Sequence, residues 1–113
     1  MRASDIYIES GKEALEHIRN FRKIARKVKE IVTSRHPEAR VLVFGSALRG
    51  DYTAASDIDI LIVADLDDRE KVELKVDIRR ALGLSVPVEI HVASPGEFEE
   101  WYSRFIGEYE EVN

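Results

Sequence analysis

Cysteine is absent from this 113-residue sequence, so disulfide bonds and thiolate metal sites are excluded. Glutamine is absent as well, while lysine, arginine and glutamate are plentiful, a bias that is weakly typical of heat-adapted proteins. No apolar run approaches the roughly 20 residues that a membrane-spanning helix needs. The first ten residues also lack the apolar stretch of a secretory signal, so we expect a cytoplasmic protein without membrane contact.

The length and composition are typical of a single globular domain spanning residues 1–113. Hydrophobic residues make up 44% of the chain and charged residues 35%, and a chain of this length can bury one core but not two. The net charge of −5 argues against a general nucleic-acid binder, and we expect no direct nucleic-acid contact.

The charge is unevenly distributed along the chain. Residues 97–111 are mostly acidic, whereas the stretch from 19 to 29 has six basic residues and no acidic one. These six residues, called the basic stripe below, are Arg19, Arg22, Lys23, Arg26, Lys27 and Lys29. Such a stripe is usually a solvated helix face; the alternative is a docking surface for an anionic partner or a nucleotide.

Hydrophobic periodicity predicts alternating helices and strands. Over residues 10–35 apolar side chains recur every three or four positions, which indicates one long amphipathic helix begun by a capping box of Ser10 and Glu13. The chain must leave helical geometry before Pro37. Strands are predicted at 40–45, 57–64 and 86–92, and helices at 67–83 and about 95–110.

Both of the later helices have an alternative interpretation. Residues 72–78 alternate like a strand, but a helix is preferred because Asp67 or Asp68 can cap it and Gly83 can end it. Along one side of the C-terminal helix we expect the aromatic residues Phe98, Trp101, Tyr102, Phe105 and Tyr109. Trp101 and Phe98 are expected to pack against the sheet, and a contact face for a partner is the alternative.

The turn after the first strand has the features of a phosphate site. Gly45 lets a ligand approach the backbone closely, and the helical turn that follows presents free N–H groups. Ser46 adds a hydroxyl, and Arg49 adds a charged fork. The Walker pattern is absent, because no Lys-Ser or Lys-Thr follows the glycines. Taken alone, this turn favours the simpler interpretation, a tight bend capped by serine.

Two aspartates at the start of the second predicted strand change that balance. Alternation along a strand places Asp57 and Asp59 on one face, with Cα atoms about 6.6 Å apart. The isoleucines at 58, 60 and 62 take the opposite face and anchor it in the core. Two neighbouring carboxylates are costly without a positive charge, and they can hold one or two Mg²⁺ ions. The alternative is a solvated pair at a strand edge.

The third predicted strand offers a further carboxylate. Its valines and isoleucine share one face, so Glu89 and His91 share the other. If this strand lies beside the second, Glu89 joins the aspartates as a third metal ligand or as the base that takes a proton from a hydroxyl. An exposed glutamate is the alternative, and His91 is interpreted as structural, as single histidines on strands usually are.

The motif Gly45-Ser46, ten residues, then Asp57-Ile58-Asp59 resembles the signature of the nucleotidyltransferase superfamily that includes DNA polymerase beta. The compact chain is similar to the minimal nucleotidyltransferases (MNT) of prokaryotes. This resemblance implies a two-layer α/β (α+β) nucleotidyltransferase fold, with a small mixed β-sheet backed by helices and a catalytic core over about 40–92. It implies that Gly45 and Ser46 hold the triphosphate of a nucleotide.

The same resemblance implies that Asp57 and Asp59 bind Mg²⁺ and that a third acid assists them. That acid is Glu89 here, where the family usually has aspartate, and position 48 is leucine where a small residue is common. MNT proteins often pair with a HEPN-domain toxin. The resemblance therefore implies a hetero-oligomer in which this chain is the antitoxin and transfers AMP from ATP to a tyrosine of the HEPN partner.

Two other functions remain open on the sequence. An antitoxin can neutralise its partner by masking it without catalysis, and a related enzyme can transfer a nucleotide to a small molecule. If the protein is a nucleotidyltransferase, we expect an in-line attack of the acceptor hydroxyl on the α-phosphate of ATP, with release of pyrophosphate.

Overall fold

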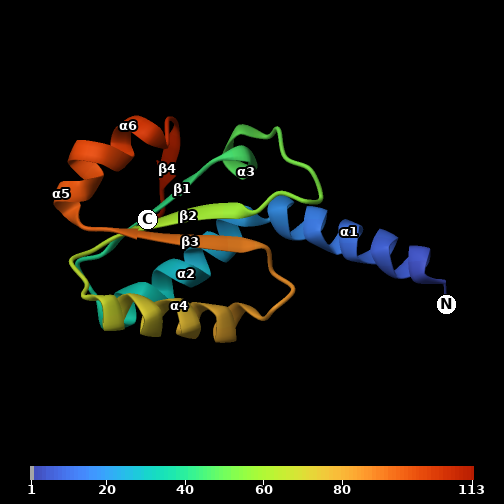
Figure 1. Cartoon of the computed structure of the whole chain (residues 1–113), viewed down its shortest axis with the longest axis horizontal. Helices are drawn as coiled ribbons and strands as arrows, with labels where there is room; N and C mark the ends of the chain where they lie inside the picture. Colours follow the sequence, from blue (N-terminus) through green and yellow to red (C-terminus); the bar gives the residue numbers. More distant parts are fainter. Residues whose placement is uncertain (1) are drawn as a thin grey trace.

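A four-stranded mixed sheet forms the centre of the computed structural model, which describes residues 2–113 apart from the side chains of residues 3–7 (Figure 1). The strands are β1 (Arg40–Phe44), β2 (Ile58–Val63), β3 (Val88–Ala93) and β4 (Tyr109–Glu111), in the order β3-β2-β1-β4. β1 pairs antiparallel with β2 and β4, and β2 pairs parallel with β3. The predicted fold class, a small mixed sheet backed by helices, is confirmed.

Two helices cover one face of this sheet, α2 (Phe21–Arg35) and α4 (Asp68–Leu82), which lie below it in Figure 1. The predicted anchoring face of β2 packs here, because the isoleucines at 58, 60 and 62 are fully buried in the same cluster as residues of both helices. From α2 the cluster includes Ala25 and Val28, and from α4 it includes Leu74. The side chains that alternate with these isoleucines therefore face away from α2 and α4.

The prediction of one helix over 10–35 is wrong, because the chain forms two helices there. α1 (Ala3–Arg19) ends before Asn20, and α2 begins after it. Asn20 interrupts the helix through its amide: Nδ2 donates to the Glu16 carbonyl at 2.9 Å, and its backbone N–H is shared between Glu16 and His17. Asparagine competes with the helical backbone in this way. The outer part of α1 projects beyond the sheet in Figure 1.

The predicted capping box of Ser10 and Glu13 is also wrong, since Ser10 lies inside α1 and not at its start. The real helix starts seven residues earlier, at Ala3. The pattern S-x-x-E satisfies a helix terminus only where the chain is not already helical, and the residues before Ser10 continue the helix.

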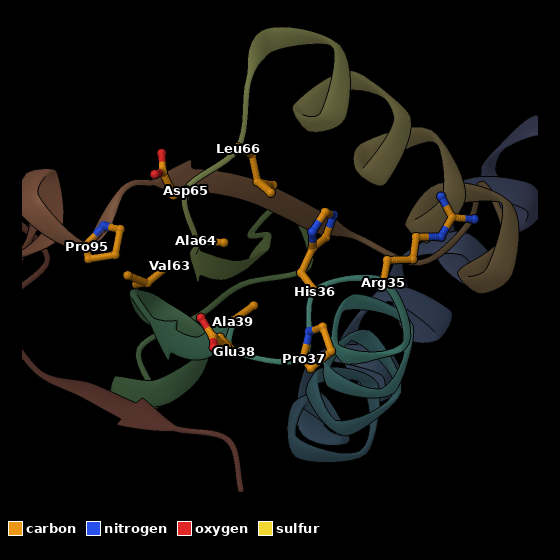
Figure 2. A pocket seen from close by; sticks show the side chains of 10 residues that line it. All are labelled: Arg35, His36, Pro37, Glu38, Ala39, Val63, Ala64, Asp65, Leu66 and Pro95. Atoms are coloured by element: carbon orange, nitrogen blue, oxygen red, sulfur yellow. The ribbon is translucent and has the colours of Figure 1, made fainter.

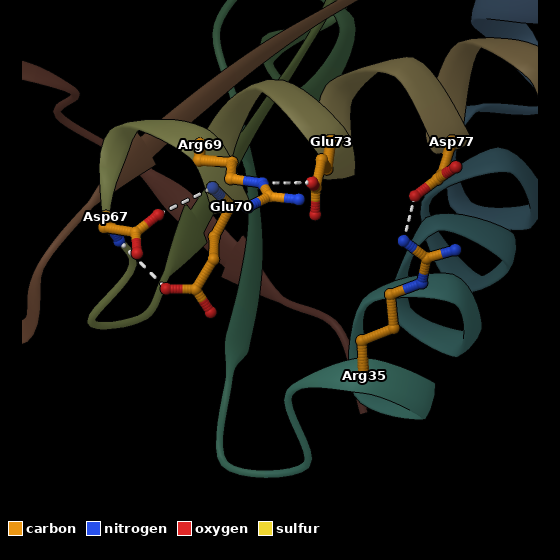
Figure 3. A network of polar contacts seen from close by, with 6 residues as sticks. All are labelled: Arg35, Asp67, Arg69, Glu70, Glu73 and Asp77. Atoms are coloured by element: carbon orange, nitrogen blue, oxygen red, sulfur yellow. Dashed lines mark hydrogen bonds and ion pairs between the residues drawn. The ribbon is translucent and has the colours of Figure 1, made fainter.

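The interpretation of 67–83 as a helix is confirmed, with a capping box at its start (Figure 3). Asp67 Oδ1 accepts from the Glu70 backbone N–H at 2.8 Å, and Glu70 Oε1 accepts from the Asp67 N–H at 3.2 Å. The valines that alternate like a strand in the sequence, Val72 and Val76, are 62% and 41% exposed. The core buries the residues that share one face of the helix, Leu74 and Ile78, and not every second residue as a strand would. An ion pair between Arg35 and Asp77 joins α2 to α4.

The predicted C-terminal helix over 95–110 is confirmed as helical over 95–105 but is wrong beyond that point. The chain forms α5 (Pro95–Glu97), a wider π-helical segment η1 (Phe98–Tyr102) and α6 (Ser103–Phe105), and then turns at Gly107 (φ +66°) into β4. β4 escaped prediction because it is short and acidic. Pairing with the edge of β1 holds it in place, and its glutamates at 110 and 111 pair with Arg22 and Arg40.

This C-terminal segment packs on the sheet face opposite α2 and α4. Phe98 is buried in a second, smaller cluster with Leu42 and Leu61, and Figure 1 shows the segment above the sheet. The expected packing against the sheet is confirmed for Phe98 but is wrong for Trp101, which is 63% exposed on the outer side of the segment together with Phe105, which is 72% exposed. Within the described chain, no helix combines the length and apolar character needed to cross a membrane.

Candidate functional site

The start of β2 lies between β1 and β3 and carries Asp59 on the face away from α2 and α4. Asp59 lies opposite Phe44 of β1 and opposite Glu89 of β3. Because side chains two residues apart on a strand share a face, His91 follows Glu89 on the same side. The parallel register of β2 and β3 thus brings two carboxylates and an imidazole together from neighbouring strands.

These three side chains form a tight group. One ligand atom from each of Asp59, Glu89 and His91 lies within 4.8 Å of the others. His91 Nε2 lies 3.4 Å from Asp59 Oδ1 and 3.9 Å from Glu89 Oε1. The imidazole also packs against the ring of Phe44, with centroids 5.3 Å apart. The sequence analysis interprets His91 as structural, but the structure includes it in this group. The signal that could have identified it is its position two residues after Glu89, on the same face of the strand.

Asp57, predicted to share the face of Asp59, lies two residues before it, and its role as a metal ligand stays a prediction. It precedes β2, which begins at Ile58, and its side chain is exposed and outside the group of three. The structure therefore brings Asp59 and Glu89 together with His91 and leaves Asp57 at the rim. The negative charge of Asp57 nevertheless helps to raise the pKa of the Asp59 carboxyl.

The Gly45 turn lies directly against Asp59. Gly45 has φ +80°, in the region that favours glycine, and a Cβ built there would collide with Asp59 Oδ2 and lie 3.2 Å from its Cγ. Glycine is required here both by the backbone conformation and by the close approach of the carboxylate. The close neighbour of this turn is a carboxylate of the protein itself, and the predicted approach of a nucleotide to Gly45 stays a prediction.

The other residues predicted for the nucleotide follow in α3 (Ser46–Arg49), a single helical turn. Ser46 is half-buried and directly follows Gly45, the residue that lies against Asp59. Arg49 is exposed at the end of the turn, and its Nε lies 3.4 Å from a carboxylate oxygen of Asp51. The fork of Arg49 is thus paired at the surface and is not part of the acidic group.

The electrostatics of the group favour a cation. Burial raises the pKa of the Asp59 carboxyl above its usual value, and the charges of Glu89 and Asp57 act in the same direction. The hydrogen bond with His91 lowers this pKa but does not reverse the shift. Two carboxylates and an imidazole offer a donor set that suits a divalent ion, and their oxygens favour Mg²⁺ or Mn²⁺. The residues present therefore fit a divalent metal.

A pocket of about 430 Å³ lies at the other end of the strands (Figure 2). It is lined by the end of β2 with Asp65, by the loop after α2 with His36, and by Pro95. Figure 2 shows Arg35 and Asp65 on opposite sides of it, and Arg35 is paired with Asp77. None of the residues predicted for the site lines this pocket, so the acidic group remains the candidate site.

Comparison with known proteins agrees with this geometry. Residues 25–111 match the sequence profile of the nucleotidyltransferase domain. The chain belongs to this family. A crystal structure described as a "putative nucleotidyltransferase" aligns with a TM-score of 0.66 and 31% identity, over 78% of this chain and 96% of that one. A second so described, from Sulfolobus solfataricus, aligns with a TM-score of 0.61 and 27% identity, over 88% and 85%.

Two curated proteins of Methanocaldococcus jannaschii are similar in sequence. "Putative protein adenylyltransferase MJ1379" is 32% identical over 76 residues, which cover 64% of this chain and 76% of that protein. "Putative protein adenylyltransferase MJ0604" is 64% identical over 28 residues, a match that spans only 25% of this chain and 28% of that protein. The nucleotidyltransferase domain is thus shown by the profile and the structures together.

The close approach of Gly45 to Asp59 predicts a difference between two glycine substitutions. Gly45→Ala and Gly50→Ala both place a side chain at positive φ, which costs about 1 to 2 kcal/mol in the left-handed conformation of Gly50 and about 1 to 3 kcal/mol in the nearly glycine-only conformation of Gly45, where ψ is −162°. Only the methyl group at 45 meets a neighbour, since nothing lies within 4 Å of a Cβ at 50. We expect Gly45→Ala to unfold at lower denaturant and also to weaken Mn²⁺ binding, measured by electron paramagnetic resonance. Equal Mn²⁺ affinities in the two variants would contradict the contact.

The raised pKa of Asp59 predicts a pH-dependent effect of Asp59→Asn in metal-free nucleotidyltransferase. The folded-state pKa lies above the unfolded value of about 3.9, so the proton on this carboxyl stabilises the fold at low pH. That stabilisation is lost as the pH rises through the folded-state pKa. An amide at 59 does not titrate, so the variant should gain thermal stability relative to the wild type as pH rises. Melting temperatures in EDTA measure this, with the exposed Asp65→Asn as control; a difference independent of pH refutes it.

Proposed function

We propose that the protein is a Mg²⁺-dependent adenylyltransferase that transfers AMP from ATP to a tyrosine hydroxyl of a HEPN-domain toxin and so acts as its antitoxin. The observation that carries the proposal is the group of Asp59, Glu89 and His91 beside the Gly45 turn, within a nucleotidyltransferase domain. The names of the two Methanocaldococcus relatives support protein as the acceptor class. The resemblance to MNT proteins supports a HEPN partner.

The chemistry requires a bond from the acceptor oxygen to the α-phosphorus and cleavage of the bond from that phosphorus to the bridging oxygen of pyrophosphate. Asp59 and Glu89 would hold Mg²⁺, with His91 adjacent and Asp57 available at the rim. The bound ion supplies positive charge for the phosphates and the attacking oxygen. Glu89 is the most exposed of the three, at 57% of its side chain, so its carboxylate is accessible to take the acceptor proton. Gly45 and Ser46 contact the departing phosphates.

The acceptor needs a docking surface, and the basic stripe is poorly suited to it. Arg22 donates to both carboxylate oxygens of Glu110, at 2.8 and 3.1 Å. Lys27 Nζ donates to the Ala81 carbonyl, and Lys29 Nζ donates to the Ala39 carbonyl. Three of the six basic side chains thus make contacts within the chain, and reversing them would disturb the fold as well as any interface.

The exposed aromatic rings of the C-terminal segment fit a docking surface better. Trp101 and Phe105 stack with centroids 5.0 Å apart and ring planes at 28°, although both rings are mostly exposed. Their inward neighbours, Phe98 and Tyr102, pack on the sheet, so this short segment is apolar on two sides. Exposed acidic residues near the pair include Glu99 and Glu100, and Arg104 is an exposed basic residue beside Phe105. The matching acceptor surface has apolar side chains ringed by lysine and arginine.

The transfer is tested by mass spectrometry of a HEPN-domain acceptor after incubation with ATP and Mg²⁺. We expect the wild-type protein to add the mass of one AMP, located on a tyrosine. Asp59→Asn should lower the rate about 100-fold or more, because it removes charge stabilisation that acts mainly in the transition state. Binding of the acceptor should persist. Asp65→Asn, at the far end of β2, serves as the matched control and should retain full activity.

Two results of that experiment would refute catalysis as the role. In the first, the acceptor gains no AMP with wild-type protein and its toxicity is nonetheless silenced, which would mean that masking suffices. Alternatively, Asp59→Asn silences the acceptor as well as the wild type does. Modification of small hydroxyl compounds in place of the protein would assign the enzyme to the class of small-molecule nucleotidyltransferases.

The docking surface is tested by the double change Trp101→Ala and Phe105→Ala. Loss of two exposed anchors should weaken acceptor binding by about 2 kcal/mol or more, measured by calorimetry, without changing the melting temperature by more than a few degrees. Val72→Ala removes a similarly exposed apolar side chain on α4 and should have no effect. If Arg26→Glu weakens binding and the aromatic changes do not, the acceptor docks on the basic stripe of α2 instead.

A further inference from the structure

Arg79 makes an unusual set of contacts for an arginine near the surface. From the last turn of α4 its half-buried guanidinium reaches the connection between α4 and β3. Nη1 donates to the Val86 carbonyl at 2.7 Å, and Nη2 donates to the Val88 carbonyl at 3.0 Å. Nη1 also lies 3.3 Å from the Gly83 carbonyl at the end of the helix. All of these acceptors belong to the backbone.

The strand that receives these bonds is the edge strand of the sheet. β3 pairs with β2 on one side only, so carbonyls on its outer side have no partner from another strand. On the inner side, the Ile58 N–H donates to the Pro87 carbonyl at 2.7 Å. The carbonyls of residues 86 to 88 are therefore held alternately by Arg79 from outside and by β2 from inside. A planar guanidinium bridges two carbonyls in this way, whereas an ammonium is a single point donor.

The bonds of Arg79 lie one residue before Glu89. Val88 lies opposite Ile58, and Glu89 lies opposite Asp59. The side chain of Glu89 is 57% exposed, and its ion pair with His91 is long, at 3.9 Å. A side chain with so weak a contact of its own depends on its backbone for its position. The contacts that hold the backbone at the start of β3 therefore determine how close the carboxylate of Glu89 lies to that of Asp59.

We propose that Arg79 is a positioning residue that, by bonding the carbonyls of Val86 and Val88, holds Glu89 beside Asp59 and so completes the divalent cation site. The inference rests on the proposed function, because it assigns Glu89 a part in that site. Arg79 touches neither the cation nor the nucleotide in this scheme and acts only through the backbone before Glu89. Its neighbour Arg80 is exposed and is a matched control on the same helix.

The test is the affinity for Mn²⁺, measured by electron paramagnetic resonance on the full-length protein without nucleotide or acceptor. Arg79→Lys keeps the charge and the helix but offers one donor group where the fork spans two carbonyls. We expect Mn²⁺ binding to weaken about tenfold, the lower end of the effect of groups that orient metal ligands. Arg80→Lys should bind as the wild type does. Glu89→Gln should weaken binding as well.

The double variant Arg79→Lys with Glu89→Gln separates positioning from general loosening of the fold. If Arg79 acts through Glu89, adding Arg79→Lys to Glu89→Gln should cause no further loss of affinity. A further loss equal to that in the wild-type background would overturn the proposal, as would wild-type affinity in Arg79→Lys with only a lowered melting temperature. Should Arg79→Lys be unfolded at the assay temperature, Arg79→Gln, whose amide still donates one bond to this segment, replaces it with the same expected pattern.

The same titration distinguishes this inference from the proposed function. Wild-type protein that binds no Mn²⁺ would refute the metal site itself, and the positioning role with it. Wild-type binding that Arg79→Lys leaves unchanged would refute only the role of Arg79.

Discussion

The parallel pairing of β2 with β3 is the constraint on which the candidate site depends. Each strand carries its acidic residue near its beginning, and two parallel strands place their beginnings at the same edge of the sheet. The register that sets Asp59 opposite Glu89 also sets His91 one step further along the same face. A shift of one residue would turn one strand's side chains to the other face, which would bury its carboxylate against α2 and α4. The isoleucines of β2 exclude that shift.

The fold and the site place opposite electrostatic demands on the chain. Elsewhere, carboxylates are paired with arginines: Glu110 with Arg22, and Glu111 with Arg40, which lowers the pKa of both glutamates. Exposed pairs of this kind stabilise a protein little. At the site, the carboxylate of Asp59 lies beside the imidazole of His91, and its pKa is raised by burial and by the charges of Glu89 and Asp57. The stability of the fold therefore comes from the apolar face of the sheet, and the other face can tolerate a charge imbalance that favours a cation.

The two faces of the sheet differ in how completely they are covered. α2 and α4 cover one face with a continuous core. The C-terminal segment covers only part of the other, where Phe98 packs on Leu42 and Leu61, and the acidic group lies on the same face nearer the start of the strands. A ligand of the acidic group thus approaches from the side that carries α3 and the C-terminal segment in Figure 1. The exposed stack of Trp101 and Phe105 belongs to the same segment.

Local patterns in the sequence were sufficient for much of this structure. Helix α4 follows from Asp67 and Gly83 at its ends, the three longer strands follow from their apolar runs, and the Gly45 turn followed by Asp59 follows from motif and spacing. These features are local because caps, turns and alternation involve residues a few positions apart. The sequence analysis also placed Glu89 on the correct face, although only if β3 lies beside β2.

Tertiary structure alone decided the remaining features, since each depends on contacts between distant residues. Glu110 lies in a strand because β1 has an open edge and Arg22 is within reach of its carboxylate. Trp101 faces outward because the sheet face available to its segment is filled by Phe98 and its neighbours. His91 and Glu89 meet Asp59 because the register between β2 and β3 is set by the packing of the whole apolar face, which no single stretch of sequence contains.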